Sequence, residues 1–151
     1  MNLAQRLKKH FIDDGVEINE PASEADVDAF QEKYGVVLPD DLKEYFLTFN
    51  GTGQGNFGGS GYAFFSLAEF EPICQSSDLA AEESEIYRDC FAFSDYMIWC
   101  WGYVIRLTSS VGSNDVLSIY LDKPSNLKVA NCFSQFIELY LEDPDDIIGS
   151  T

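Results

Sequence analysis

Residues 38–51 have the sequence LPDDLKEYFLTFNG, and this stretch predicts the central helix of the fold. Its apolar side chains recur at i, i+3, i+4 and i+7, which places them on one face of a helix about three turns long. They are Leu42, Tyr45, Phe46 and Phe49. Since three of these four residues are aromatic, the helix needs a large apolar surface to pack against. We therefore expect it to lie in the core.

The two ends of this stretch agree with a helix between them. Pro39 has a φ angle suited to a first helical turn and no N–H to leave unpaired there. Asp40 and Asp41 place carboxylates at the positive N-terminal end, where they act as caps or as partners of the helix dipole. Asn50 and Gly51 tolerate the left-handed conformation that ends many helices.

Two further helices are predicted before this one. The first repeats apolar residues at every fourth position and ends at Gly15. Its apolar face consists of Leu3, Leu7 and Phe11. The second begins with Ser23 and Asp26, which have the spacing of a capping box, and ends at Gly35. Its apolar face consists of Val27, Phe30 and Tyr34.

A run of strands follows in the second half of the chain, where aromatic and β-branched residues are frequent. The predicted strands are residues 62–67, 91–93, 96–107 and 116–121. A short acidic helix at residues 79–88, capped by Asp78, interrupts them, and a last helix carries Phe133, Phe136, Ile137, Tyr140 and Leu141 on one face. Helices, then strands, then a helix predict an α+β fold with a mostly antiparallel sheet, in one domain spanning residues 1–151.

Residues 51–61 contain six glycines and even a literal G-x-G-x-x-G pattern, at residues 53–58. A dinucleotide site needs a strand before this pattern and a helix after it, so that the pyrophosphate meets a helix N-terminus. Here a helix precedes and a strand follows, and no Lys or Arg occurs between Lys43 and Arg88. The pattern therefore indicates a flexible or closely packed loop, and no cofactor is expected.

The charge balance is strongly acidic, with 26 Asp and Glu residues against 9 Lys and Arg residues and a formal net charge of −17. Such a surface repels nucleic acid and anionic lipid and attracts basic partners. Simple solubility is the alternative interpretation. The N-terminus lacks the apolar run of a signal peptide, and the longest apolar run, residues 96–105, is too short for a membrane span. We expect a cytoplasmic protein that contacts neither nucleic acid nor membrane.

No local pattern of catalytic or metal-binding residues is present. The four cysteines lack C-x-x-C spacing, so we expect reduced thiols and no metal: Cys74, Cys90, Cys100 and Cys132. His10 is the only histidine, and its position beside lysines on the first helix predicts a surface residue. Adjacent carboxylates such as Asp13 and Asp14 point in different directions on a helix, so they do not form an acid–base pair. We therefore expect no enzyme, although dispersed catalytic residues would leave no local signature.

Trp99 and Trp101 alternate with Ile98 and Cys100, so in the predicted strand both indoles lie on one face. Two interpretations remain open. The indoles are either part of the core or an aromatic platform at a partner's groove, where tryptophan is frequent among residues that dominate binding.

The pattern resembles the SUKH superfamily, the Smi/Knr-type domain of yeast cell-wall regulators and bacterial immunity proteins. The resemblance is carried by FQEKYG at residues 30–35, by LPDDLKEYF at 38–46, and by Asn50 and Gly51 before a glycine-rich connection. Supporting segments at 103–107, 116–121 and 129–141 extend it over residues 22–141, and the long glycine loop departs from it. The resemblance implies an α+β domain without catalytic activity.

Within that resemblance, single-domain bacterial members are typically immunity proteins that bind and neutralise a cognate toxin, often a nuclease. A nuclease is basic because it holds phosphates, so an acidic protein suits its capture. The alternatives are a regulatory scaffold of the cell-wall-regulator kind and an enzyme with a dispersed site. We expect the immunity protein to be a monomer or a weak homodimer.

One acidic block stands out as a candidate toxin-facing surface. Residues 13–44 contain many carboxylates, but several of them cap helices or lie at helix N-termini. In the block within residues 69–95, only Arg88 offsets the negative charge. The hypothesis is that this second block, with the two indoles, contacts the partner. Its residues are Asp78, Glu82, Glu83, Glu85, Asp89, Trp99 and Trp101.

Overall fold

A computed structural model describes residues 1–73, 85–99, 101–110, 114–119 and 128–144 of the 151-residue chain. The described helices are α1 (Leu3–Asp13), α2 (Glu24–Tyr34), α3 (Asp40–Thr48) and α6 (Phe133–Glu142). The described strands are β1 (Tyr62–Phe64), β2 (Glu71–Pro72), β3 (Cys90–Tyr96), β4 (Trp101–Arg106), β5 (Val116–Ile119) and β6 (Lys128–Ala130).

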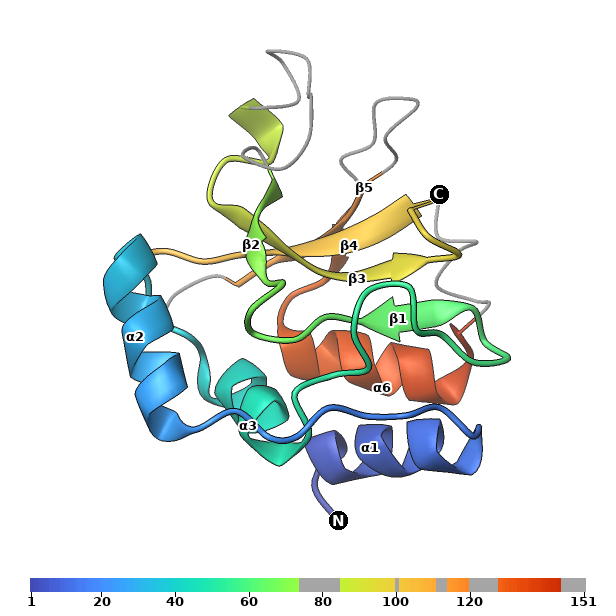
Figure 1. Cartoon of the computed structure of the whole chain (residues 1–151). Coiled ribbons are helices and arrows are strands. Elements are labelled where there is room, and N and C mark those ends of the chain that lie inside the picture. Colours follow the sequence, from blue (N-terminus) through green and yellow to red (C-terminus); the bar gives the residue numbers. More distant parts are fainter. Residues whose placement is uncertain (74–84, 100, 111–113, 120–127, 145–151) are drawn as a thin grey trace.

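The six strands form one antiparallel sheet in the order β1-β3-β4-β5-β6, and β2 pairs with β3 beside β1. Helices α1, α3 and α6 lie together against one face of this sheet (Figure 1). The expected α+β fold with an antiparallel sheet is confirmed.

The apolar residues divide between the two faces of the sheet. In β4, Tyr103 and Ile105 join the core under the helices, whereas Val104 joins a smaller cluster on the opposite face. This alternation is what a strand buried on both faces requires. The larger cluster includes all four predicted residues of the central helix, and each is fully buried.

Local signals set the ends of α2 as the sequence predicts, whereas Pro39, expected in the first turn of α3, is the extended residue just before that helix. Ser23 and Asp26 form the capping box of α2, and Gly35 ends that helix with a φ of +65°. Asn50 and Gly51 follow α3 with φ angles of +56° and +80°. Asp41 caps a different helix, because its Oδ2 accepts hydrogen bonds of 2.8 Å from the backbone N–H and the hydroxyl of Ser134 at the start of α6.

The strand predicted at residues 96–107 is wrong in its first part. Tyr96 is the last residue of β3, residues 97–99 form a turn, and β4 begins only at Trp101. The first strand is shorter than residues 62–67, since β1 ends at Phe64. Of the acidic helix predicted at residues 79–88, only residues 85–88 are described. The end of the strand predicted at 116–121 also lies outside the described residues.

Candidate partner-binding surface

The glycine-rich loop, residues 51–61, is fastened to the segment that links α1 and α2. Asn19 donates from its backbone and its side chain to the carbonyl oxygens of Gly51 and Asn50, both at 3.0 Å. The backbone N–H of Gly59 donates to Asp14 at 2.7 Å. No helix follows the loop, which leads into β1. The loop is therefore packed against its own chain, as the interpretation of a closely packed loop predicts.

His10 is half-buried, so it is less exposed than the prediction of a surface residue implies. Its Nε2 lies 3.0 Å from the hydroxyl of Tyr140, which also lies 3.0 Å from the hydroxyl of Ser60. Burial lowers the pKa of His10, although the negative charges of Asp14 and Asp13 act to raise it. Because the histidine contacts a tyrosine instead of the serine, these residues join α1, α6 and the glycine-rich loop without forming a serine–histidine pair.

The two tryptophans do not share a face. Trp101 stacks on Tyr96, with ring centroids 4.1 Å apart, on the helix side of the sheet. Trp99 lies in the turn, where its ring meets Phe65 edge to face at 5.8 Å and belongs to the cluster on the opposite side. Trp99 also covers Gly102, where an added Cβ would be 2.5 Å from the indole ring. Both indoles are half-buried, so packing accounts for much of each ring.

Asp95 is a buried carboxylate that the sequence analysis missed. Its side chain is 2% exposed, and it stands between Ala63 on β1 and Gly102 on β4, which leave room for it. It accepts a hydrogen bond from the backbone N–H of Trp99. Its Oδ1 has no hydrogen-bond partner within the described residues. Burial raises the pKa of Asp95 to about 6, although the Trp99 N–H opposes the shift.

The acidic block within residues 69–95 can be examined only in part. Glu85 and Asp89 are exposed, and Glu85 has only a distant contact with Arg88, at 3.9 Å between two largely solvated side chains. Such a pair contributes little to stability, so it leaves the carboxylate available. Asp78, Glu82 and Glu83 lie outside the described residues. The assignment of this block to a partner surface stays a prediction.

The first acidic block contains a set of three carboxylates on α2, of which only Glu24 lies in the first turn, where the helix dipole favours an acidic residue. Glu24, Asp28 and Glu32 are spaced at i, i+4 and i+8, so they form a stripe along the exposed side of α2. Within the described part of the chain, none of the three side chains makes a hydrogen bond or an ion pair. We call these three residues the α2 acidic stripe. The sequence analysis did not single out this stripe, because a neighbouring acidic residue, Asp26, caps the helix.

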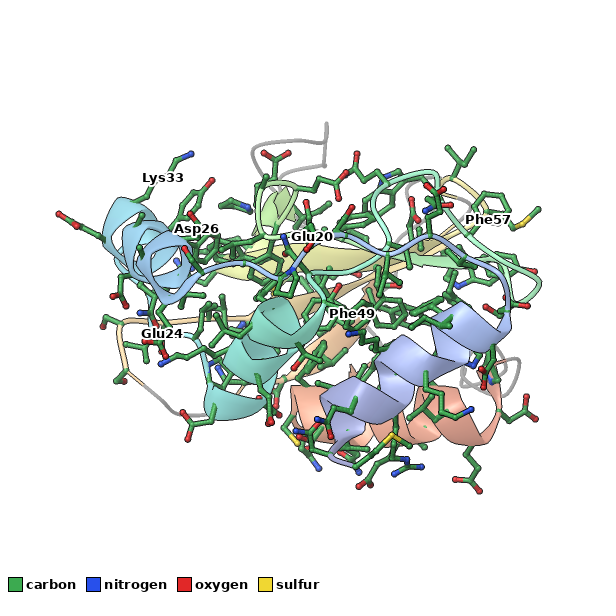
Figure 2. The ribbon with its side chains drawn as sticks, turned by 60° about the horizontal axis from the view of Figure 1, so that its bottom comes forward. Glu20, Glu24, Asp26, Lys33, Phe49 and Phe57 are labelled. Carbon is green, nitrogen blue, oxygen red and sulfur yellow. The ribbon has the colours of Figure 1, made fainter. Side chains whose placement is uncertain are left out.

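A shallow, mostly apolar groove of about 370 Å³ lies on the other side of α2. Figure 2 shows Lys33 above this helix and Glu24 below it. The groove is lined by Ala22, Asp26, Ala29, Phe30, Lys33, Asn50, Leu67 and Ala68. Asp26 is held by Ser23 in the capping box, and Lys33 lies 5.0 Å from the centre of the Tyr34 ring. These two opposite charges do not form the group of converging ionisable residues that an enzyme site needs.

A comparison with protein-family models gives one finding. The model of the SMI1/KNR4 family (SUKH-1) matches residues 21–139, from the segment before α2 to the last turns of α6. This chain belongs to the SUKH-1 family. No curated protein matches it.

Within the described residues of this SUKH-1 chain, none of the helices combines the length and the apolar composition that crossing a membrane requires. The same residues include no group of three or more His, Cys, Asp or Glu side chains that could hold a metal ion.

Proposed function

We propose that this SUKH-1 protein is a non-enzymatic immunity protein that binds and neutralises a cognate toxin. The partner is a basic protein, and a nuclease fits best because nucleases need cations to hold phosphates. The family membership supports a role in binding, and the net charge of −17 supports a basic partner. Neutralisation then needs only that the acidic surface cover the cations of the toxin's active site.

The α2 acidic stripe carries this proposal. Like charges at i and i+4 destabilise a helix by about 0.2–0.5 kcal/mol per pair, and the stripe contains two such pairs. Glu32 also lies near the C-terminal end of α2, where the helix dipole disfavours a negative charge. Within the described residues no ion pair offsets the repulsion between these carboxylates, and Lys33 is the basic residue of the last turn of α2. A basic partner would supply the missing positive charges.

A regulatory scaffold remains the second candidate function. The groove beside α2 favours it, because an open apolar groove with one charge of each sign suits a peptide segment better than a basic toxin surface. The two functions differ in their partner. The immunity protein binds a basic toxin, whereas the scaffold binds a segment of a regulatory protein.

Growth rescue tests the proposed function. The protein encoded by the neighbouring gene is expressed alone and with this chain, and the purified pair is measured by surface plasmon resonance. We expect restored growth and an association rate that falls steeply as salt rises, while the dissociation rate changes less. An absence of both rescue and binding would contradict the immunity function and favour the scaffold.

Charge reversals identify which acidic surface matters. The triple variant Glu82→Lys, Glu83→Lys, Glu85→Lys is expected to weaken neutralisation while its circular dichroism stays that of the parent protein. The same reversal on the α2 acidic stripe, Glu24→Lys, Asp28→Lys, Glu32→Lys, changes the net charge by the same amount, so the comparison shows which of the two acidic surfaces contacts the partner. Full rescue by the folded first variant would remove the block within residues 69–95 from the partner surface.

A further inference from the structure

The turn between β3 and β4 has an unusual backbone. Three consecutive residues are left-handed, with φ angles of +48° for Met97, +57° for Ile98 and +63° for Trp99. Hairpin turns of this hand normally use Asn and Gly, which adopt positive φ at little cost. For non-glycine residues this conformation is strained, and for a β-branched residue such as isoleucine it is an outlier.

Two backbone hydrogen bonds and one aromatic contact hold this turn in place. The backbone N–H of Met97 donates to the carbonyl oxygen of Gly61 at 2.9 Å. The backbone N–H of Trp99 donates to the buried carboxylate of Asp95, and the Trp99 ring packs on Phe65. The strained conformation is therefore imposed by residues on either side of the turn, since its own sequence does not favour it.

The result of this arrangement is that two apolar side chains face solvent. Met97 is 45% exposed and Ile98 is 66% exposed, whereas Trp99 is turned inward. Neither exposed side chain contributes to the core. A strained backbone supported by a buried, incompletely paired carboxylate is the kind of local cost that occurs at functional sites.

More exposed apolar surface lies at the same end of the molecule. Helices α1 and α6 both finish at the end where β3 turns into β4 (Figure 1). Apart from Met1, the remaining large exposed apolar residues of the described chain belong to the last turns of these helices: Ile12, 52% exposed, and Leu139, 37% exposed. The hydrogen bond from the Tyr62 hydroxyl to Pro144, at 3.4 Å, joins the end of α6 to β1 beside the turn.

The electrostatic field at this end is negative. The C-terminal residues of a helix carry partial negative charge, and here acidic residues follow both helices: Asp14 caps α1, and Glu142 and Asp143 end α6. The last turn of α6 has no basic residue, and that of α1 has only His10. Since burial lowers the pKa of His10, this histidine offsets the field less than an ordinary histidine would.

We propose that the β3–β4 turn is the anchor of the partner interface, with Met97 and Ile98 inserted into an apolar pocket of a basic partner protein. The carboxylates at the ends of α1 and α6 face the cations around that pocket. Apolar anchors inside a charged rim are the usual organisation of a protein–protein interface. This proposal rests on the proposed function and names the contact surface of the same partner.

The anchor and the acidic surface affect different rate constants. Charges spread over the surface steer the encounter and raise the association rate, whereas desolvated anchors mainly determine the dissociation rate. The double variant Met97→Asn, Ile98→Gly places residues that tolerate positive φ in the turn. We expect its unfolding midpoint to equal or exceed that of the parent protein, and its dissociation rate to rise by about tenfold or more.

The probe is the purified protein encoded by the neighbouring gene, and its binding is measured by surface plasmon resonance. Met97→Leu, Ile98→Leu keeps an apolar tip and is expected to retain slow dissociation. Glu24→Lys, Asp28→Lys, Glu32→Lys is the matched control, because it should lower the association rate and leave the dissociation rate near that of the parent. Together these variants separate an apolar anchor from a general effect of charge or folding.

Each outcome bears on one proposal in a defined way. If the parent protein does not bind the probe, the proposed function fails and the anchor fails with it. If the parent binds and the Asn-Gly variant dissociates at the parent's rate, the anchor alone is overturned. If light scattering shows a parent dimer and a monomeric Asn-Gly variant, a second copy of this chain covers the turn and the basic partner is rejected as its occupant.

Discussion

The hydroxyl group of Tyr45 donates a hydrogen bond of 2.7 Å to the carbonyl oxygen of Phe65, and the Tyr45 side chain is fully buried. Tyr45 belongs to α3, and Phe65 directly follows β1, so this bond links the central helix to the sheet. Burial raises the pKa of Tyr45 well above its usual value, and Glu69 adds to the effect. The phenol therefore remains protonated at neutral pH, where it remains a donor.

Replacing Tyr45 by Phe should cost about 1–3 kcal/mol of unfolding free energy, because a buried carbonyl group loses its partner. Urea denaturation measures the effect. The control is Tyr34→Phe, since the Tyr34 side chain is half-buried and its hydroxyl makes no hydrogen bond within the described residues. Equal midpoints for the two variants would show that the Tyr45 hydroxyl contributes nothing to stability.

Phe46→Ala should be more damaging, at about 3–5 kcal/mol, the usual range for truncating a buried phenylalanine. Phe46 is fully buried and its ring lies 5.3 Å from that of Phe70, so the truncation leaves a cavity between α3 and the residue just before β2. Phe57→Ala serves as the control, because Phe57 is only half-buried in the glycine-rich loop. An unfolding midpoint for Phe46→Ala within error of the parent would mean that the residue is not part of the core.

The helices were predictable because their signals are local. The capping box of Ser23 and Asp26 and the stop at Gly35 involve residues a few positions apart, and the structure confirms both. The turn at residues 97–99 was not predictable in this way. Its sequence contains neither Gly nor Asn, and its left-handed backbone is imposed in part by Gly61, on a distant segment.

The candidate site was harder to predict than the fold for a related reason. Asp95 is one acid among many in the sequence, and only its pairing with Ala63 and Gly102 shows that it is buried. The prediction that both tryptophans share a face assumed that residues 96–107 form one strand. Trp99 lies in a turn instead, so the alternation of side chains along a strand does not apply to it. The sequence signal that could have indicated a buried Asp95 is the polar pair Ser94-Asp95 at the end of an apolar run.

Asp95 should make stability fall as the pH rises from about 4 to about 6. Its pKa in the folded protein is raised to about 6 from 3.8, so in this interval the folded state holds a proton that the unfolded state has lost. Since unfolding then releases the proton, each step upward in pH favours the unfolded state, and the penalty is complete above the folded pKa. Asp95→Asn removes this titration, and it should flatten the stability profile between these two pH values.

Thermal denaturation across this interval, for the parent and for Asp95→Asn, measures the difference. Other carboxylates titrate in the same range, so the quantity to compare is the difference between the two profiles. His10 does not cause the fall in stability, because its pKa is lowered in the folded protein. Its contribution to the unfolding free energy therefore increases as the pH rises. Parallel profiles for the two proteins would show that Asp95 titrates as an ordinary exposed carboxylate.

All four cysteines should be reduced in the native protein. Cys90 and Cys132 are free thiols, whereas Cys74 and Cys100 lie outside the described residues. A reductant should therefore leave the melting temperature unchanged, and alkylation of freshly denatured protein should modify every thiol by mass spectrometry. A disulfide in freshly purified protein would place the chain in an oxidising compartment and weaken the cytoplasmic immunity proposal.

Glu32→Lys should separate stability from partner binding in a single substitution. The new lysine would follow Asp28 at i+4 and would face the negative end of the α2 dipole, so we expect a gain of about 0.3–0.5 kcal/mol in unfolding free energy. The same change removes negative charge from the α2 acidic stripe. The association rate with the basic partner should therefore fall at low salt, and the difference from the parent should shrink at high salt.

Glu32→Gln is the matched control, because it removes the charge without adding a cation, and it should lie between the parent and Glu32→Lys in both measurements. Chemical denaturation gives the stability, and stopped-flow association at two salt concentrations gives the rate. A more stable Glu32→Lys variant that associates as fast as the parent would show that the α2 acidic stripe does not steer the partner. The like-charge repulsion within α2 would then need an explanation other than the capture of a basic protein.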